Sequence, residues 1–237
     1  MSYFYHEAAE TEHTLITLSA GESHHLVHVL RKESGAAIKV LNGKGNCFAA
    51  TLSGGSGKAA HVQLGECIQR EDIPAVRLCL AVAPTKNNDR MEWLTEKATE
   101  LGVWRIQPVI MAHSERKHIR TDKWQQAAVA AMKQSGNLFL PQIPEPITLE
   151  QWVAQSKSAA ARFVGLQHAP SWPTPHSSWR QGEIEVLIGP EGGFSAAEEK
   201  QLIAEGIQPL GVSANRLRVE TAALTVLVQF QFLETPL

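Results

Sequence analysis

The first seventy residues alternate between short runs of apolar and polar positions and turn signals, a pattern typical of a small β-rich unit. The Asn42-Gly43 pair predicts a tight hairpin turn, and the glycine-rich residues 54–57 predict another loop. Ser19 and Glu22 have the spacing of a capping box, so a short helix is expected after Ser19. The candidate strands are residues 14–19, 37–41, 48–52 and 60–64. Short strands at this spacing predict a small barrel.

Beyond a linker at residues 70–76, longer apolar runs alternate with helical patterns. This alternation predicts a parallel sheet covered on both faces, and therefore an α/β domain. We expect two domains, residues 1–70 and 77–237. The predicted strands are residues 78–82, 106–110, 162–165 and 185–188, and the predicted helices are 91–101, 122–134 and 195–206. A surface loop rich in Pro, Ser and Trp is expected over residues 170–181.

The predicted last helix, about residues 220–232, is apolar on nearly every side. Such a helix must be covered on all sides, and the edge of a domain covers only one. The pattern fits a central core helix and a helix that packs on a second subunit equally well.

Charge narrows the kinds of partner. The net charge of −2 excludes attraction of the whole chain to nucleic acid, but residues 86–133 carry nine Lys or Arg against six Asp or Glu. A local basic excess of this size is usually a solvated face and can also be a phosphate-binding patch.

The three cysteines are widely spaced and form no CxxC pair, which indicates reduced thiols in a cytoplasmic protein. His24 and His28 have a spacing that can bind zinc, but no third ligand accompanies them, so no metal site is predicted. No signal peptide or membrane-spanning segment is recognisable, and we expect a soluble cytoplasmic protein without a membrane partner.

The segment at residues 187–195 (LIGPEGGFS) lies between a predicted buried strand and a capped helix. Its glycines and proline turn the backbone sharply and leave main-chain groups accessible to a flat, polar ligand. The carboxyl end of a strand in an open α/β sheet is also where ligands bind. A purely structural turn is the alternative, and we favour a site for a nucleoside-type ligand.

A second segment, residues 216–222 (RLRVETA), directly precedes the apolar helix. Arg218 and Glu220 would lie beside a dry region, where each charge needs a specific partner. They are interpreted as an ion pair that caps the helix, as part of a pocket wall, or as both.

Several motifs, in order along nearly the whole chain, resemble those of the RsmE family, the 16S ribosomal RNA uridine-N3 methyltransferases of the SPOUT superfamily. They are SHHLVHVLR at 23–31, MEWLTEKATELG at 91–102, HSER at 113–116, Gln134-Ser135 with Pro141 beyond, IGPEGGF at 188–194, and Leu217-Arg218 with Glu220-Thr-Ala222. One departure is Gly211-Val-Ser213, where family members usually show Ser-Leu-Gly.

The resemblance implies a PUA-like β-barrel domain followed by a trefoil-knotted α/β domain, which binds S-adenosyl-L-methionine and dimerises through the last helix. It implies a substrate in 16S rRNA, in the assembled small ribosomal subunit. The implied cofactor-binding residues are Gly165, Leu166, Ile188, Gly189, Pro190, Glu191, Gly192, Gly193, Leu210, Val212, Leu217 and Thr221. The implied catalytic residues are Arg116 and Arg218, and the implied RNA contacts are His28, Arg31, Lys86, Arg90 and Lys117.

The implied reaction is methyl transfer to N3 of a uridine in the decoding region. Glu191 and Glu220 are candidate proton acceptors, and both are equally interpretable as structural residues. Two alternatives remain: the same chemistry on another RNA, such as transfer RNA, and a non-catalytic RNA-binding or assembly protein with this fold.

Overall fold

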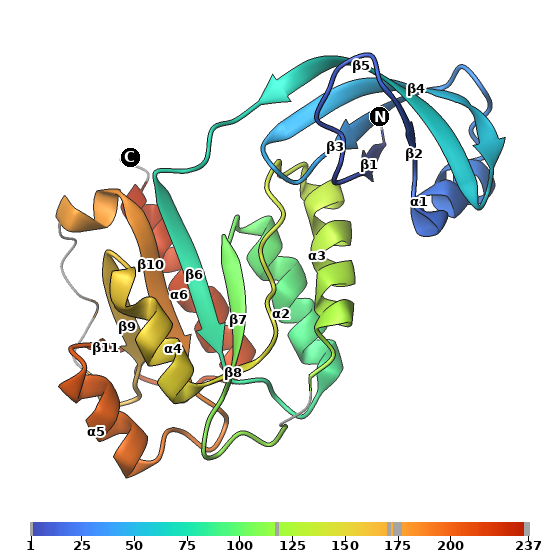
Figure 1. Ribbon diagram of the computed structural model, residues 1–237. Coiled ribbons are helices and arrows are strands. Elements are labelled where there is room, and N and C mark those ends of the chain that lie inside the picture. Colours follow the sequence, from blue (N-terminus) through green and yellow to red (C-terminus); the bar gives the residue numbers. More distant parts are fainter. Residues whose placement is uncertain (1, 117–118, 170–171, 173–176, 235–237) are drawn as a thin grey trace. The chain divides into compact units, whose positions relative to one another are not determined.

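A computed structural model describes residues 2–116, 119–169, 172 and 177–234 of the chain. The chain divides into two units, one made of Met1–Ile73 with Val129–Leu140 and the other of Pro74–Ala128 with Pro141–Leu237 (Figure 1). Helix α3 (Thr121–Ser135) contributes residues to both units.

The first unit is built on one five-stranded sheet of order β1-β3-β4-β5-β2. The strands are β1 (Tyr3–Tyr5), β2 (Leu15–Thr17), β3 (Ala37–Leu41), β4 (Asn46–Ser56) and β5 (Ala59–Arg70). Phe4, Leu26 and Phe48 belong to its apolar core. A second cluster joins Leu41 and Cys47 to Met132 of α3 and to Leu138, which follows this helix.

The predicted strands of this unit are present, but the predicted loop at residues 54–57 is wrong. Gly54 and Gly55 lie within β4, where the pairing with β5 shifts register after Leu52. Both glycines have positive φ, which lets the strand continue through the irregularity. The chain turns only at Gly57 and Lys58.

Helix α1 (Ala20–His24) starts where predicted, and the Ser19 hydroxyl oxygen accepts a hydrogen bond from the Glu22 N–H. Glu22 does not complete the expected capping box. Its carboxylate accepts instead from the Tyr5 N–H and the Lys133 ammonium. After α1 the chain continues as a π-helical segment, His25–Val29.

The second unit is a six-stranded sheet of order β11-β9-β10-β6-β7-β8, in which every described pairing is parallel. The strands are β6 (Val76–Val82), β7 (Arg105–Ile110), β8 (Ile147–Thr148), β9 (Ala161–Gly165), β10 (Gly182–Ile188) and β11 (Gln208–Leu210). The helices are α2 (Asn88–Glu100), α4 (Leu149–Gln155), α5 (Ala196–Ala204) and α6 (Val219–Glu234). The predicted parallel α/β architecture is confirmed.

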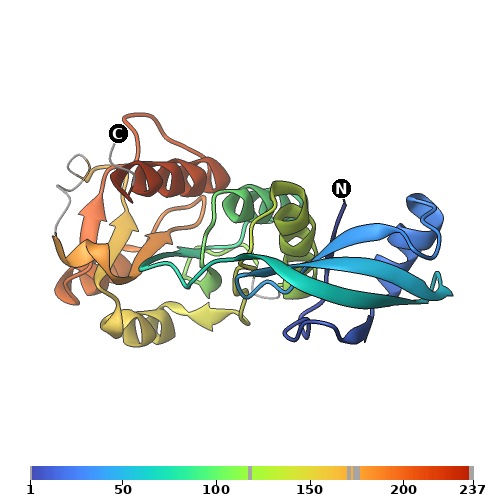
Figure 2. The same ribbon diagram turned by 90° about the horizontal axis from the view of Figure 1, so that it is seen from above.

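Helices cover both faces of this sheet (Figure 2). On one face, Trp152 of α4 and Leu202 of α5 pack with Leu187 of β10. On the other face, α6 packs on β6 and β10 and beside α2. Sequence patterns missed α4, β8 and β11, which are short.

The expected surface loop at residues 170–181 is partly wrong and lies partly outside the described residues. Ser177–Arg180 form a 3-10 helix, and Trp179 is buried with its ring edge-on to Phe163. Phe230 of α6 also packs on Phe163. This aromatic contact explains why part of a polar segment is ordered against the sheet.

Helix α6 is buried along one face through Ala223, Val226, Leu227 and Phe230, whereas Leu224 and Val228 remain half-buried. Among the described residues, no helix has both the length and the apolar composition needed to cross a bilayer.

Candidate active site

A cavity of about 670 Å³ opens where the carboxyl ends of β9, β10 and β11 meet. These ends lie together because the three strands are neighbours in the parallel sheet. The walls come from the strand ends and the loops after them, from α5 and from the start of α6. The lining residues are Gly165, Leu166, Gln167, His168, Ala169, Ile188, Gly189, Pro190, Glu191, Gly192, Gly193, Phe194, Glu199, Ile203, Pro209, Val212, Ser213, Asn215, Arg216, Leu217, Val219 and Ala222.

Glycine is required in these loops because neighbouring side chains leave no room for a Cβ. A Cβ on Gly189 would lie 2.7 Å from the Phe194 ring, and one on Gly165 would lie 2.9 Å from Ile188 Cδ1. Gly193 has a φ of +74°, a conformation that disfavours other residues. The absence of side chains therefore brings three loops close together around one cavity.

Two basic side chains from distant segments hold the loop at residues 189–193. Arg216 Nη2 donates to the Glu191 carbonyl at 2.8 Å. His113 Nδ1 lies 3.1 Å from the Gly193 carbonyl. The loop after β10 is thus fixed by the segments after β11 and β7.

The helix after this loop starts with the predicted capping box, in which Ser195 and Glu198 exchange hydrogen bonds. Glu198 also accepts from the Ala112 N–H at 2.7 Å. Burial raises the pKa of the Glu198 carboxyl, but these donors outweigh it and lower the pKa below its ordinary value. An ionised Glu198 therefore links α5 to the segment after β7.

Arg90 of α2 bridges two acidic residues of this region. Its Nη1 donates to Glu191 Oε1 at 3.2 Å, and its Nε lies 3.7 Å from Glu220 Oε1. Glu220 is buried, as expected for a charge beside the apolar helix, and Arg90 is its ion-pair partner. The expected partner for Arg218 is not found, because this side chain is exposed and makes no described contact.

All predicted cofactor-binding residues except Leu210 and Thr221 line the cavity. Leu210 is buried, and its carbonyl accepts from the N–H of the lining residue Leu166 at 3.1 Å. Thr221 is exposed on the first turn of α6. The structure therefore gathers ten of the twelve residues around one space.

Neither of the predicted catalytic arginines is among the lining residues. Arg116 is half-buried and donates to Asn88 Oδ1 at 2.6 Å, and Arg218 faces solvent. Lys86 is exposed just before α2, whereas Lys117 lies outside the described residues.

The predicted RNA contacts of the first unit, His28 and Arg31, are exposed. His28 belongs to the π-helical segment and its ring lies against Gly57, where a Cβ would meet it at 1.9 Å. Arg31 has a φ of +50°, an uncommon conformation for a residue with a side chain.

Sequence patterns missed Arg216 and His113, although both lie within or beside the quoted motifs. Gln167 and His168 were also missed. They follow closely after the predicted strand 162–165, and this position at the carboxyl end of a strand could have indicated them as site residues. Glu199 and Ile203 of α5 also line the cavity. Nothing in the sequence of this helix distinguished them from ordinary surface residues.

Two known protein families match separate parts of this chain. The sequence model of the family described as RNA methyltransferase domain matches residues 72–231, and the model described as RNA methyltransferase PUA domain matches residues 18–65. The chain belongs to the RNA methyltransferase family.

Individual relatives of this RNA methyltransferase agree with that result. It is 29% identical over 228 residues to the ribosomal RNA small subunit methyltransferase E of Synechocystis, covering 92% of this chain and 73% of that one. It is 26% identical to the protein of the same name from Aquifex aeolicus, covering 95% and 97%.

The structure is similar to that of ribosomal RNA small subunit methyltransferase E from Neisseria gonorrhoeae, which was solved bound to S-adenosyl methionine. The TM-score is 0.83 at 26% identity, and 98% of each chain is covered. The predicted family resemblance and the fold class, a PUA-like unit followed by a parallel α/β methyltransferase unit, are confirmed. The trefoil knot stays a prediction.

Proposed function

We propose that this RNA methyltransferase transfers the methyl group of S-adenosyl-L-methionine to N3 of a uridine in the decoding region of 16S rRNA. The observation that carries the proposal is the cavity formed by three loops at the carboxyl ends of β9, β10 and β11. Two relatives are named ribosomal RNA small subunit methyltransferase E, and this name supports small-subunit ribosomal RNA as the substrate.

The cavity fits the cofactor in size and chemistry. Its volume of about 670 Å³ lies within the usual range for small-molecule sites. Leu166, Ile188 and Leu217 offer apolar surface for a purine ring, and Glu191 and Glu199 offer negative charge that suits a sulfonium cation. The Leu210 carbonyl accepts a hydrogen bond from the N–H of the lining residue Leu166, and Thr221 directly precedes the lining residue Ala222 in α6.

When bound, S-adenosylmethionine supplies an electrophilic methyl group on a sulfonium. The chain must then hold the acceptor in line with this group, and positioning of this kind can lower a barrier by roughly 7–11 kcal/mol. Uridine N3 is protonated at neutral pH, so cations that stabilise the uridinate favour the reaction. N3 also lies on the pairing edge, and the base must be unpaired first.

We assign the role of stabilising the uridinate or the adjacent phosphate to Arg116 and Arg218. Arg218 has its guanidinium free among the described residues, and Arg116 is oriented by Asn88. Lys86 and Lys117 on the second unit, and His28 and Arg31 on the first, are proposed to contact the RNA backbone.

A homodimer through the second unit is part of the proposal. Leu224 and Val228 of α6 are half-buried, and Trp93 on the adjacent α2 is 45% exposed. Leu224 and Val228 lie one turn apart and so share a face of α6, which we propose a second copy covers. A ribosomal substrate would also place the protein in the cytoplasm.

The test is to incubate the purified protein and labelled S-adenosylmethionine with small ribosomal subunits from cells that lack the gene. Mass spectrometry of the nucleosides should find N3-methyluridine at one decoding-region position. Cofactor binding without transfer to these subunits would point to another RNA, such as transfer RNA. Failure to bind the cofactor would favour a non-catalytic assembly protein.

A further inference from the structure

Arg90 connects three separate parts of the chain. It belongs to the first turn of α2, and its guanidinium contacts Glu191 in the loop after β10 and Glu220 in the first turn of α6. Glu191 lines the cavity, and so does Val219, which precedes Glu220. Two walls of the cavity therefore meet at one arginine.

The two carboxylates differ in environment. The Glu220 side chain is 9% exposed, and its Oε2 is buried without a hydrogen-bond partner among the described residues. The Glu191 side chain is 43% exposed. A buried carboxylate is costly without a counter-charge, so Glu220 depends on Arg90 much more than Glu191 does. Glu220 anchors Arg90, and the anchored Arg90 restrains Glu191.

This arrangement argues against a phosphate contact for Arg90. Arg90 with Glu191 and Glu220 carries a net charge of −1, so the guanidinium is already compensated. A phosphate would have to displace Glu191 from it.

We propose that Arg90 is a positioning residue of the cofactor site, which ties the loop at residues 189–193 and the start of α6 to α2, and is not an RNA contact. The inference rests on the proposed use of S-adenosylmethionine.

The experiment measures cofactor affinity by calorimetry and RNA affinity with a 16S rRNA fragment for Arg90→Ala, Glu191→Gln and the double variant. We expect Arg90→Ala to weaken cofactor binding about ten-fold or more and to leave RNA affinity unchanged. Glu191→Gln should also weaken cofactor binding. The double variant should bind no more weakly than Arg90→Ala, because both changes break the same contact.

The matched control is Lys97→Ala, which removes a cation on the same helix that bridges Glu96 and Glu100 away from the cavity. It should leave cofactor affinity unchanged. Because Arg90→Ala leaves a buried charge on Glu220, Arg90→Ala/Glu220→Gln should unfold at a higher temperature than Arg90→Ala and still bind the cofactor weakly.

Wild-type cofactor affinity in Arg90→Ala combined with weaker RNA binding would overturn the inference, as would additive losses in Arg90→Ala/Glu191→Gln. If the wild-type protein itself binds no S-adenosylmethionine, the proposed function fails, and hydrogen exchange then decides the positioning role. Amides at residues 191–193 and 219–222 should exchange faster in Arg90→Ala than in Lys97→Ala, and equal rates would refute the tie.

Discussion

The ring of Phe194 occupies the position that a side chain on Gly189 would need, with its nearest carbon 2.7 Å from an ideal Cβ. Phe194 packs against the apolar cluster between the sheet and α4 and α5. The conformation of the loop at residues 189–193 is therefore set by the core that Phe194 packs against.

We predict that Gly189→Ala displaces Phe194 or the loop and lowers cofactor affinity at least ten-fold. Overpacking of this kind typically costs about 1–3 kcal/mol of stability. Thermal unfolding and calorimetry measure both effects. Gly21→Ala is the control, since a Cβ there meets nothing within 4 Å, and an equal response of the two variants would contradict the packing argument.

Replacing Arg116 by Ala should reduce methyl transfer and leave S-adenosylmethionine affinity intact, because Arg116 does not line the cavity. Asn88→Ala should give part of the same loss, since it frees the Arg116 guanidinium. Single-turnover transfer to small subunits is the measurement. Lys157→Ala, in an exposed pair with Glu205, is the control. Full turnover in Arg116→Ala would remove the residue from the proposed mechanism.

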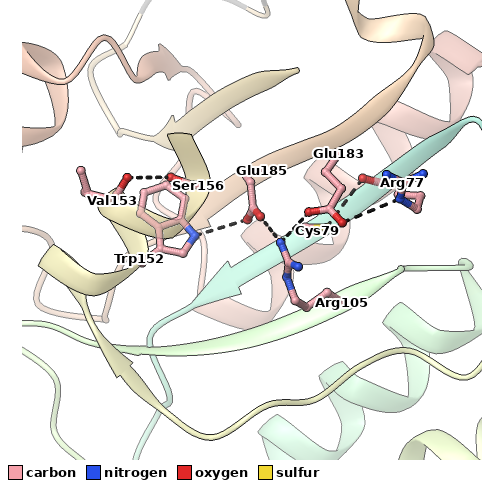
Figure 3. Close-up of polar contacts among 8 residues, drawn as sticks. All are labelled: Arg77, Cys79, Arg105, Trp152, Val153, Ser156, Glu183 and Glu185. Carbon is pink, nitrogen blue, oxygen red and sulfur yellow. Dashed lines mark hydrogen bonds and ion pairs between the residues drawn. The ribbon is translucent and has the colours of Figure 1, made fainter. Parts of the chain in front are cut away.

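A charged network crosses the sheet at the amino ends of β6, β7 and β10 (Figure 3). Arg105 donates to Glu183 Oε2 at 2.8 Å and also to Glu185, whose Oε2 accepts from Trp152 Nε1 at 3.3 Å. The Glu185 side chain is only 3% exposed, so its charge relies on Arg105.

Arg105→Met should consequently destabilise the protein by about 3–5 kcal/mol, the range for breaking a buried pair. Arg105→Met/Glu185→Met should recover much of that loss, because no uncompensated buried charge remains. Urea unfolding compares the variants. A double variant as unstable as the single one would show that packing, rather than the unpaired carboxylate, determines the effect.

Glu198 predicts a dependence of stability on pH. Its pKa in the folded protein is lowered from its ordinary value of 4.5, so its ionised form stabilises the folded state above that value. That stability is lost as the pH falls through the lowered pKa. Glu198→Gln should be less stable at pH 7 and should show a smaller loss of stability on acidification below pH 4.5, as followed by unfolding at several pH values. Parallel profiles for the two proteins would exclude this role.

Local patterns of apolar periods, turns and caps predicted all the strands except β1, β8 and β11, and the helices α1, α2, α3, α5 and α6. They failed where tertiary contacts decide the conformation. Trp179 is buried only because Phe163 and Phe230 come from distant segments. The continuation of β4 through Gly54 depends on its partner β5.

In the candidate site, too, local features could be predicted and tertiary contacts could not. The motifs located most of the cavity lining, because glycine- and proline-rich turns are visible in a sequence. The partners of Arg90 could not be predicted, since residues 90, 191 and 220 are brought together only by the order of the strands in the sheet.

The end of helix α3 belongs to the first unit, and this limits how the chain can be cut into fragments that fold. The first unit contains residues 129–140 as well as the N-terminal segment, so the chain crosses between the units three times. A fragment that ends at residue 73 would lack Met132 and Leu138, which pack with Leu41 and Cys47. The complementary fragment would expose those two side chains to water. A single cut would therefore not release the first unit, and a single fusion would not transplant it. Gain or loss of this unit by simple recombination would have to preserve an insertion in the middle of the second unit.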